Sequence, residues 1–385
     1  MHSVRIHRVI ALIISIFYRI GVWHRGDQPT VKEIRIKSLY CLYYALFFLS
    51  FVVGAKNTDK MDDSIFLAEV SIGTAVLAMK FWLLVWKQNE ILNLLNRVCV
   101  FSIRIEDDFN RFNNNLRGFM KFVFVFAIAI TGAGSLSTIV FPLLGRDRTL
   151  FVDIGFPLDY RGNEIAFWLA ATFLFTEMFL SVIIMLFTVV IWYLLLTCSL
   201  RYKVLESELR NMGRISGKSS RKMMKRQIHN NFTEDLKTSI DAHLHLKDLI
   251  QEVESFFLNL FFIQLATSGL CICGSIYCLA FDIGDNLVER LIYIFVFFYF
   301  IAELFMITYF GNEIMLSSNR LSYSLFEPDW YNQPQSTKKC IIIFGEYLKK
   351  PQELVIGKLY PLTLETFTRV MNSAYSMFNI LKSFQ

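Results

Sequence analysis

The chain has 385 residues, of which 54% are hydrophobic and 16% aromatic, and its mean hydropathy is +0.43. This composition excludes an ordinary water-soluble globular protein. The net charge of +6 calls for no nucleic-acid partner, because the basic residues lie beside apolar segments and form no single patch. Most of the seven cysteines lie in those segments or on their basic side, so we expect no disulfide framework.

The first apolar stretch, Val9–Tyr18, follows Arg5 and Arg8 and is too short to cross a membrane. No small-residue cleavage site follows it, which argues against the alternative of a cleaved signal peptide. We therefore predict a half-inserted or interfacial helix within an N-terminal segment, residues 1–35.

Seven longer apolar segments follow and predict an all-α membrane protein with seven transmembrane helices. Lys and Arg are concentrated in the N-terminal segment and in alternate connections, which places the N-terminus in the cytoplasm and the C-terminus outside. Six helices would occupy residues 36–316, followed by a cytoplasmic anchor region, 317–360, and the last helix, 361–385. The predicted spans are 36–56, 65–87, 118–140, 165–196, 257–280, 289–316 and 361–382.

The fourth and fifth spans are predicted to continue well beyond the bilayer. No Gly or Pro, the main helix breakers, occurs from Asn163 to Met212 or from Lys218 to Ser268. We expect these helices to form a cytoplasmic bundle used for assembly, or alternatively to fold back within one monomer. The basic connection 211–226 contains Gly217-Lys218-Ser219 but lacks the upstream Gly of a phosphate-binding loop, which leaves a flexible turn with affinity for anionic lipid.

Nothing in the pattern predicts an enzyme, a cofactor or a metal site. The six histidines all lie outside the predicted spans. His243 and His245 are two residues apart and so would point to different faces of a helix. No pairing of a nucleophile with a base stands out within the spans.

Charged residues inside the predicted spans are better candidates, because charge is costly in a bilayer. Lys80 lies near the inner end of the second span, and we expect its amine to extend to the interface. Glu69 lies at the opposite end of that span. Glu177 and Glu303 lie deeper in the fourth and sixth spans, where they would form either hydrogen bonds between helices or contacts with a ligand.

The outer halves of the fourth and sixth spans are rich in aromatic residues. Such a lining suits a pocket for a small apolar molecule, although single rings would also face lipid or other helices. These residues are Phe167, Trp168, Phe173, Phe175, Tyr293, Phe295, Phe297 and Phe298.

The last span is too polar to face lipid on all sides. Asn372, Ser376, Asn379 and Ser383 recur at helical spacing and form one polar stripe, which predicts a helix that lines water or is shielded by protein. Ile380 beside the stripe is suited to close a pore by a hydrophobic constriction. The alternative is a buried helix in a tight bundle.

The last third of the chain resembles the insect odorant receptors. The resemblance rests on Tyr309–Glu313, Trp330, the segment Lys338–Leu348 and the closing segment Ser373–Leu381. Weaker similarity appears at Phe156–Tyr160, at Phe167-Trp168 and at Lys80. One residue of the family's closing Ser-Tyr-Ser motif is replaced by Ala374.

The resemblance implies a tetrameric ligand-gated cation channel in the plasma membrane of an olfactory neuron, at its dendrite. In such a channel the seventh helices surround the pore, and Ile380 and Ser383 would occupy gate and pore-lining positions. The connection 197–256 lacks the long insertion of the co-receptor, so the chain resembles an odorant-tuning subunit that works with a co-receptor in a heterotetramer. The implied partners are that co-receptor, a small volatile apolar ligand, membrane lipid and permeating cations. The expected pocket residues are Ile72, Gly73, Val76, Thr131, Ser135, Phe173, Glu177, Tyr293 and Phe297.

Three other classes remain as alternatives. Arg146-Asp147-Arg148 and Asn372–Tyr375 resemble short motifs of G-protein-coupled receptors, but the first lies on the side poor in Lys and Arg and the second lacks a proline. A gustatory receptor is nearer, yet its usual closing Thr-Tyr-hydrophobic triplet is missing. A transporter is disfavoured because the chain shows no internal repeat.

Overall fold

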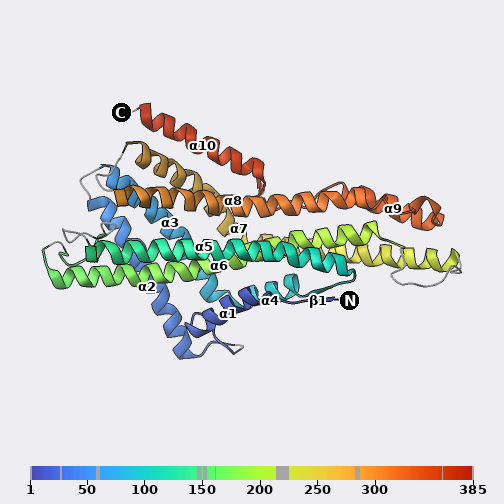
Figure 1. The fold of residues 1–385 in the computed structure, drawn as a ribbon, viewed down its shortest axis with the longest axis horizontal. Helices are drawn as coiled ribbons and strands as arrows, with labels where there is room; N and C mark the ends of the chain where they lie inside the picture. The colour runs from blue at the N-terminus through green and yellow to red at the C-terminus, as the bar shows by residue number, and fades with distance from the viewer. Residues whose placement is uncertain are drawn as a thin grey trace.

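A computed structural model describes residues 2–383, except 27, 58–60, 145–149, 151–153, 161, 214–224, 282–286 and 358. Helices make up almost all of the described chain (Figure 1). They are α1 (Arg8–Arg19), α2 (Val31–Asn57), α3 (Met61–Trp86), α4 (Gln88–Cys99), α5 (Glu106–Leu144), α6 (Glu164–Arg210), α7 (Lys225–Phe281), α8 (Leu287–Ser324), α9 (Gln335–Leu348) and α10 (Leu364–Ser383), with a short 3₁₀ helix η1 at Trp330–Asn332. Two small antiparallel pairs join β1 (His2–Val4) to β2 (Phe101–Ile103) and β3 (Val355–Ile356) to β4 (Tyr360–Pro361).

Three long helices form the axis of the molecule. α6, α7 and α8 pack against one another and run along its longest dimension (Figure 1). α6 has 47 residues and α7 has 57, which correspond to about 70 and 85 Å at 1.5 Å per residue. Both are more than twice the thickness of a bilayer's hydrocarbon core. The prediction of two unbroken helices longer than a membrane span is therefore confirmed.

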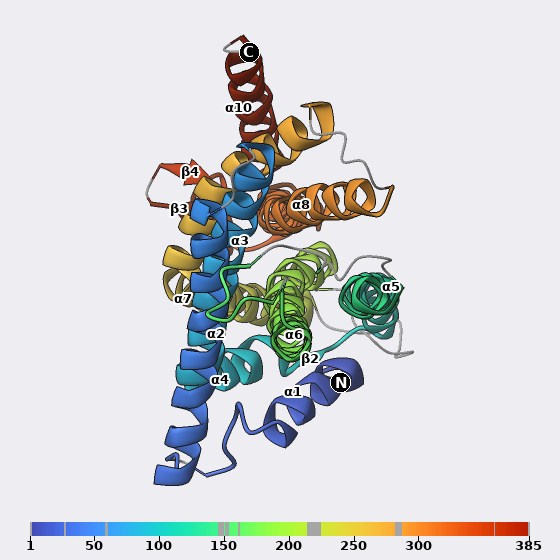
Figure 2. The same cartoon turned by 90° about the vertical axis from the view of Figure 1, so that its left-hand side faces the viewer.

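Local sequence explains where α6 begins and ends. The Asn163 side chain accepts a hydrogen bond from the backbone N–H of Ile165 at 2.9 Å and so caps the first turn. The helix ends just before Gly213, whose φ of +72° lies in the left-handed region that glycine adopts without strain. Between these points the large side chains Trp192, Tyr193 and Tyr202 are fully buried. α6 is consequently the central helix of the bundle, between α3 and α8 on one side and α5 on the other (Figure 2).

In the part of the chain that the structure describes, six helices are long and apolar enough to cross a membrane: α2, α3, α5, α6, α7 and α8. They cover the first six predicted spans. The seventh predicted span is also a helix, α10, but among the described residues it does not belong to the set that qualifies by hydropathy. It does not qualify because it is polar, the same property that distinguished this span in the sequence.

The N-terminal apolar stretch forms α1, an amphipathic helix of 12 residues. Ile10, Ile13 and Phe17 are buried, whereas Leu12 on the opposite side is 60% exposed. The helix packs on α6, and the backbone N–H of His7 donates to the hydroxyl of Tyr193 at 3.2 Å. The helix itself is confirmed; its position at a membrane interface stays a prediction.

The end of the molecule opposite the C-terminus is formed by the far parts of α6, α7 and α8 together with α9 (Figure 1). The chain then returns through the β3–β4 hairpin, whose turn contains Gly357 at φ +59°. This hairpin was not foreseen in the sequence. It is the reason that α10 begins at Leu364 and not at residue 361.

Candidate ligand site and pore helix

Most of the predicted pocket residues lie on helices that the fold brings into contact. α3 carries Ile72, Gly73 and Val76 and touches α6, which in turn packs along α8. The rings of Phe66 on α3 and Tyr293 on α8 are 4.5 Å apart at their centroids. Gly73 faces Phe300 so closely that a Cβ at this position would lie 2.8 Å from the ring. Predicted residues of α3 and α8 thus lie at contacts between these two helices, but each contact is completed by a residue that was not predicted, Phe300 or Phe66.

Phe173 on α6 lies in an aromatic cluster that α2 provides. Its ring centroid is 5.5 Å from that of Tyr43, 6.1 Å from that of Phe47 and 6.0 Å from that of Phe156. The α2 residues were absent from the predicted pocket. Their signal is visible in the sequence, since Tyr40, Tyr43, Tyr44, Phe47 and Phe51 recur at three- and four-residue spacing along one side of that helix.

Glu177 lies one helical turn from Phe173 and is completely buried. Neither carboxylate oxygen has a hydrogen-bond partner among the described residues. The polar groups beside it are engaged elsewhere: the hydroxyl of Tyr43 is 2.6 Å from that of Thr176, and the hydroxyl of Tyr44 is 3.1 Å from that of Ser181. A buried carboxyl group without a partner is costly, so Glu177 is the strongest candidate for a polar contact with a ligand.

Lys80 does not extend to a membrane interface, and that prediction was wrong. Its side chain is 1% exposed and forms an ion pair with Glu303 on α8. The amine also donates to the hydroxyl of Thr188 on α6 at 3.2 Å, while Tyr299 donates to Glu303 at 2.9 Å. The prediction failed because a partner across the bundle satisfies the amine without water.

Glu69, at the opposite end of the second span from Lys80, joins α3 to α7. One of its oxygens accepts a hydrogen bond from the hydroxyl of Ser275, and the other has no partner among the described residues. A Cβ at Gly274 would lie 3.1 Å from that second oxygen, so the small residue leaves room for the carboxyl group. Its role here is to hold two helices together.

The two predicted pocket residues on α5 are not seen in the buried cluster: one lies apart from it, and the side chain of the other is outside the described residues. Thr131 is exposed, and its hydroxyl donates to the carbonyl oxygen of Ala127 at 2.7 Å. The side chain of Ser135 lies outside the described residues, as does the segment Arg146–Arg148. Phe297 and Ile72 are half-buried, whereas Trp168, Phe175 and Phe298 are exposed on the outside of the bundle.

α10 lies at one edge of the molecule and has two different faces (Figure 2). Its inner face packs on α7 and α8, with Ala374 fully buried and the ring of Phe367 5.5 Å from that of Phe305. The other face carries the polar stripe identified in the sequence. That stripe and the neighbouring Ile380 are exposed in the single chain: Asn372, Ser376, Asn379, Ile380 and Ser383.

Comparison with known proteins identifies the family of this chain. The family model described as "7tm Odorant receptor" matches residues 63–375, which is most of the chain. The chain belongs to the insect odorant receptor family. That family is one of receptors and channels, and the spanning helices indicate a multi-pass membrane protein.

The sequence identity to individual odorant receptors is low. Odorant receptor 10 of Aedes albopictus is 25% identical over 156 residues, which are 40% of this chain and 41% of that protein. Odorant receptor Or2 of Anopheles gambiae is 21% identical, with matched segments covering 38% of this chain and 39% of that receptor. Odorant receptor 33b of Drosophila melanogaster is 23% identical over 71% of this chain and 69% of its own length.

The odorant receptor fold itself is shared over nearly the whole chain. The structure of the insect olfactory receptor OR5 from Machilis hrabei in complex with eugenol matches with a TM-score of 0.78. The match covers 98% of this chain and 100% of that one at 13% identity. At this identity the likeness concerns the fold alone.

Proposed function

We propose that the chain is the odorant-tuning subunit of a heteromeric, odorant-gated, non-selective cation channel that it forms with an odorant co-receptor. The observation that carries the proposal is the exposed polar face of α10. Polar side chains on a membrane helix are stable only against protein or water, so this face needs neighbouring subunits or an aqueous pore. A channel built around the α10 helices of four subunits provides both.

In this arrangement the seven helices α2, α3, α5, α6, α7, α8 and α10 cross the plasma membrane of an olfactory neuron. The N-terminus is cytoplasmic and the C-terminus extracellular, as the distribution of Lys and Arg favours. The far ends of α6, α7 and α8, with α9, form a cytoplasmic anchor. Asn372, Ser376, Asn379 and Ser383 face the pore, and Ile380 narrows it as a hydrophobic gate.

The ligand in this proposal is a small volatile molecule bound in the outer half of the bundle. The contacts between α3, α6 and α8 support such a site, as do the aromatic rings around Phe173. A ligand opens the channel only by binding the open conformation more tightly than the closed one. The residues proposed to line the site are Ile72, Gly73, Val76, Thr131, Ser135, Phe173, Glu177, Tyr293 and Phe297.

The position of the pocket relative to α10 supports coupling between them. α8 carries Tyr293 and Phe297 near one end, Glu303 at the buried ion pair, and Phe305 against Phe367 of α10. A ligand-induced shift of α8 would consequently reach the pore helix through direct packing. The connection between α6 and α7, residues 211–224, is short, which agrees with a tuning subunit without a long insertion.

The test is whole-cell current recorded from cells that express this chain with and without an insect odorant co-receptor, during pulses of a panel of volatile compounds. We expect a fast cation current that is independent of G proteins and requires both subunits. Current from this chain alone would show a self-sufficient channel and overturn the heteromeric proposal. Surface-expressed protein that yields no current, but a ligand-driven second messenger, would overturn the channel proposal altogether.

A second experiment tests the orientation independently of current. An epitope tag at the C-terminus should be accessible to antibody on intact cells, whereas a tag at the N-terminus should require permeabilisation. The opposite pattern would contradict the proposed topology, and with it the extracellular end of the pore helix.

A further inference from the structure

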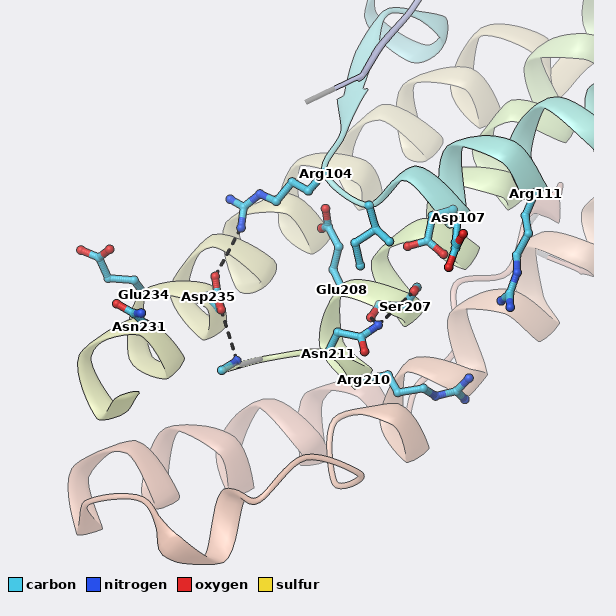
Figure 3. Close-up of a pocket in the computed structure, with 13 residues that line it drawn as sticks. Arg104, Asp107, Arg111, Ser207, Glu208, Arg210, Asn211, Asn231, Glu234 and Asp235 are labelled. Atoms are coloured by element: carbon cyan, nitrogen blue, oxygen red, sulfur yellow. Dashed lines mark hydrogen bonds and ion pairs between the residues drawn. The ribbon is translucent and has the colours of Figure 1, made fainter. Parts of the chain in front are cut away.

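A cavity of about 690 Å³ lies far from the proposed odorant site, where the end of α6 meets the beginnings of α5 and α7 (Figure 3). On the proposed orientation it faces the cytoplasm. Its volume falls in the range of small-molecule sites. The residues that line it are Arg104, Ile105, Asp107, Asp108, Arg111, Ser207, Glu208, Arg210, Asn211, Gly213, Asn231, Glu234 and Asp235.

The lining carries five acidic side chains and three arginines, so its formal charge is negative. Arg210 is moreover engaged outside the lining, with Glu206 at 3.2 Å and Glu327 at 2.7 Å, and in Figure 3 it points away from Glu208. Arg104 forms an ion pair with Asp235 at 3.3 Å. The second oxygen of Asp235 accepts the backbone N–H of Gly213 at 3.3 Å. Fewer positive groups are therefore free to face the cavity than the three arginines of its lining would indicate.

Asp108 is the decisive residue of this lining. It is only 6% exposed, yet its Oδ2 has no hydrogen-bond partner among the described residues. Asp108 lies in the first turn of α5, where the exposed backbone N–H groups of the helix favour negative charge. Because Asp108 lines the cavity, a ligand bound there can supply the donor that this carboxyl group lacks.

Glu208 adds a second carboxylate close to the first. In Figure 3 it extends from the end of α6 toward the beginning of α5, between Arg104 and Asp107. Burial raises the pKa of Glu208, Arg104 lowers it, and Asp108 and Asp235 raise it further. Three carboxylates thus share the field of one guanidinium group, and a second positive group would stabilise all of them.

We propose that this cavity binds a small organic cation carrying amine or guanidinium groups, held by Asp108 and Glu208. Ammonium and guanidinium groups supply several charge-assisted N–H donors, which match carboxylates that lack them. An anion is disfavoured by the acidic lining. A metal ion is disfavoured as well, because the described residues contain no group of three His, Cys, Asp or Glu side chains arranged to hold one.

The experiment measures binding of spermidine to the purified full-length chain in nanodiscs of neutral phosphatidylcholine, by isothermal titration calorimetry. It requires no channel activity, so its outcome is independent of the proposed function. We expect saturable binding near one spermidine per chain. Asp108→Asn and Glu208→Gln should each weaken it about tenfold, the effect of losing one charge-assisted hydrogen bond.

Two further variants separate a specific site from general attraction to negative charge. Glu346→Gln removes the same charge at an exposed position of α9 outside the cavity lining and should leave binding unchanged. Arg111→Gln removes a positive charge from the lining and should tighten binding. Equal binding by all variants would overturn the proposal, and because Arg111→Gln predicts a gain, misfolding cannot imitate the expected pattern. Absence of spermidine binding by the wild type would also overturn the proposal.

Discussion

Ion pairs differ between two regions of the helical bundle. One is the membrane part, where α3 and α8 meet; the other is the far part, at the end of the molecule opposite the C-terminus. In the membrane part, the side chains of Lys80 and Glu303 are 1% and 6% exposed, and their partners among the described residues are each other and neighbouring hydroxyl groups. In the far part, ion pairs have more exposed partners: the side chains of Lys203 and Glu313 are 35% and 23% exposed, and those of Arg104 and Asp235 are 45% and 36% exposed. The same chemical contact therefore has different consequences in the two regions. A buried charge that loses its partner has no water to replace it, whereas an exposed one does.

The largest effect is expected when the buried pair is broken on one side. Lys80→Met should lower the free energy of unfolding by about 3–5 kcal/mol, because Glu303 would remain buried without its partner. The measurement is thermal and denaturant unfolding of the purified chain in detergent. The double variant Lys80→Met with Glu303→Met should recover most of the loss, since it removes both charges. A single variant as stable as the wild type would contradict the distinction between the two regions.

The second effect concerns a neutral polar group that is buried in the far part. His243 lies outside the predicted span 257–280 and faces the rings of Tyr202, Phe344 and Tyr347. Burial, and to a lesser extent the charge of Lys247, lower the pKa of His243 from its ordinary 6.5 to about 4. Between these pH values the unfolded chain takes up a proton that the folded chain does not. Stability present above pH 6.5 should therefore be lost as the pH falls toward 4, by about 3 kcal/mol at pH 4.

The measurement for His243 is the difference in unfolding free energy between the wild type and His243→Phe at pH 7.5, 6, 5 and 4. Phenylalanine keeps the aromatic contacts but cannot be protonated. The variant should gain on the wild type steadily as the pH falls. A difference that stays constant over this range would show that His243 titrates normally in the fold.

A smaller effect is expected where α8 meets the beginning of α10. A Cβ at Gly311 would overlap the backbone carbonyl of Leu362, which no change of side-chain rotamer can relieve. Gly311→Ala should therefore cost about 1–3 kcal/mol and displace the start of α10. Gly118→Ala is the matched control, because nothing lies within 4 Å of a Cβ there. This control should gain up to about 1 kcal/mol from helix propensity, and effects of equal sign would refute the close packing.

The smallest effect belongs to the exposed pairs of the far part. The Nζ of Lys203 lies 2.7 Å from the Oε2 of Glu313, a short ion-pair distance, but the two side chains are 35% and 23% exposed. Lys203→Gln should lower the free energy of unfolding by less than about 1 kcal/mol, and the loss should shrink further in high salt. A loss as large as that of Lys80→Met would remove the contrast between the two regions.

The long apolar helices could be predicted because their signals are local, although α4 (Gln88–Cys99) and the beginning of α5 at Glu106 were missed. The absence of Gly and Pro between Asn163 and Met212 is sufficient for one long helix, and the polar spacing from Asn372 to Ser383 is sufficient for a two-faced one. The β3–β4 hairpin was missed because two strands of two residues carry almost no pattern. The aromatic residues of α2 beside Phe173 were missed for another reason: Tyr43 and Phe47 are equally suited by sequence to face lipid, and only the structure shows them in contact with Phe173.

The amino-acid sequence by itself determined that this chain is a bundle of membrane helices, which of them are too long for the membrane, and which one is too polar for lipid. These properties depend on spacing and polarity within a single segment. Only the tertiary structure decided the partners: Lys80 with Glu303, 223 residues away, Glu177 with no partner among the described residues, and Asp108 at the wall of the far cavity. The physical reason is that the rotation of each helix about its axis is set by packing against all its neighbours. A rotation of a helix about its axis brings a charged side chain into contact with its counterion or moves it away. The sequence of one segment alone does not determine that rotation.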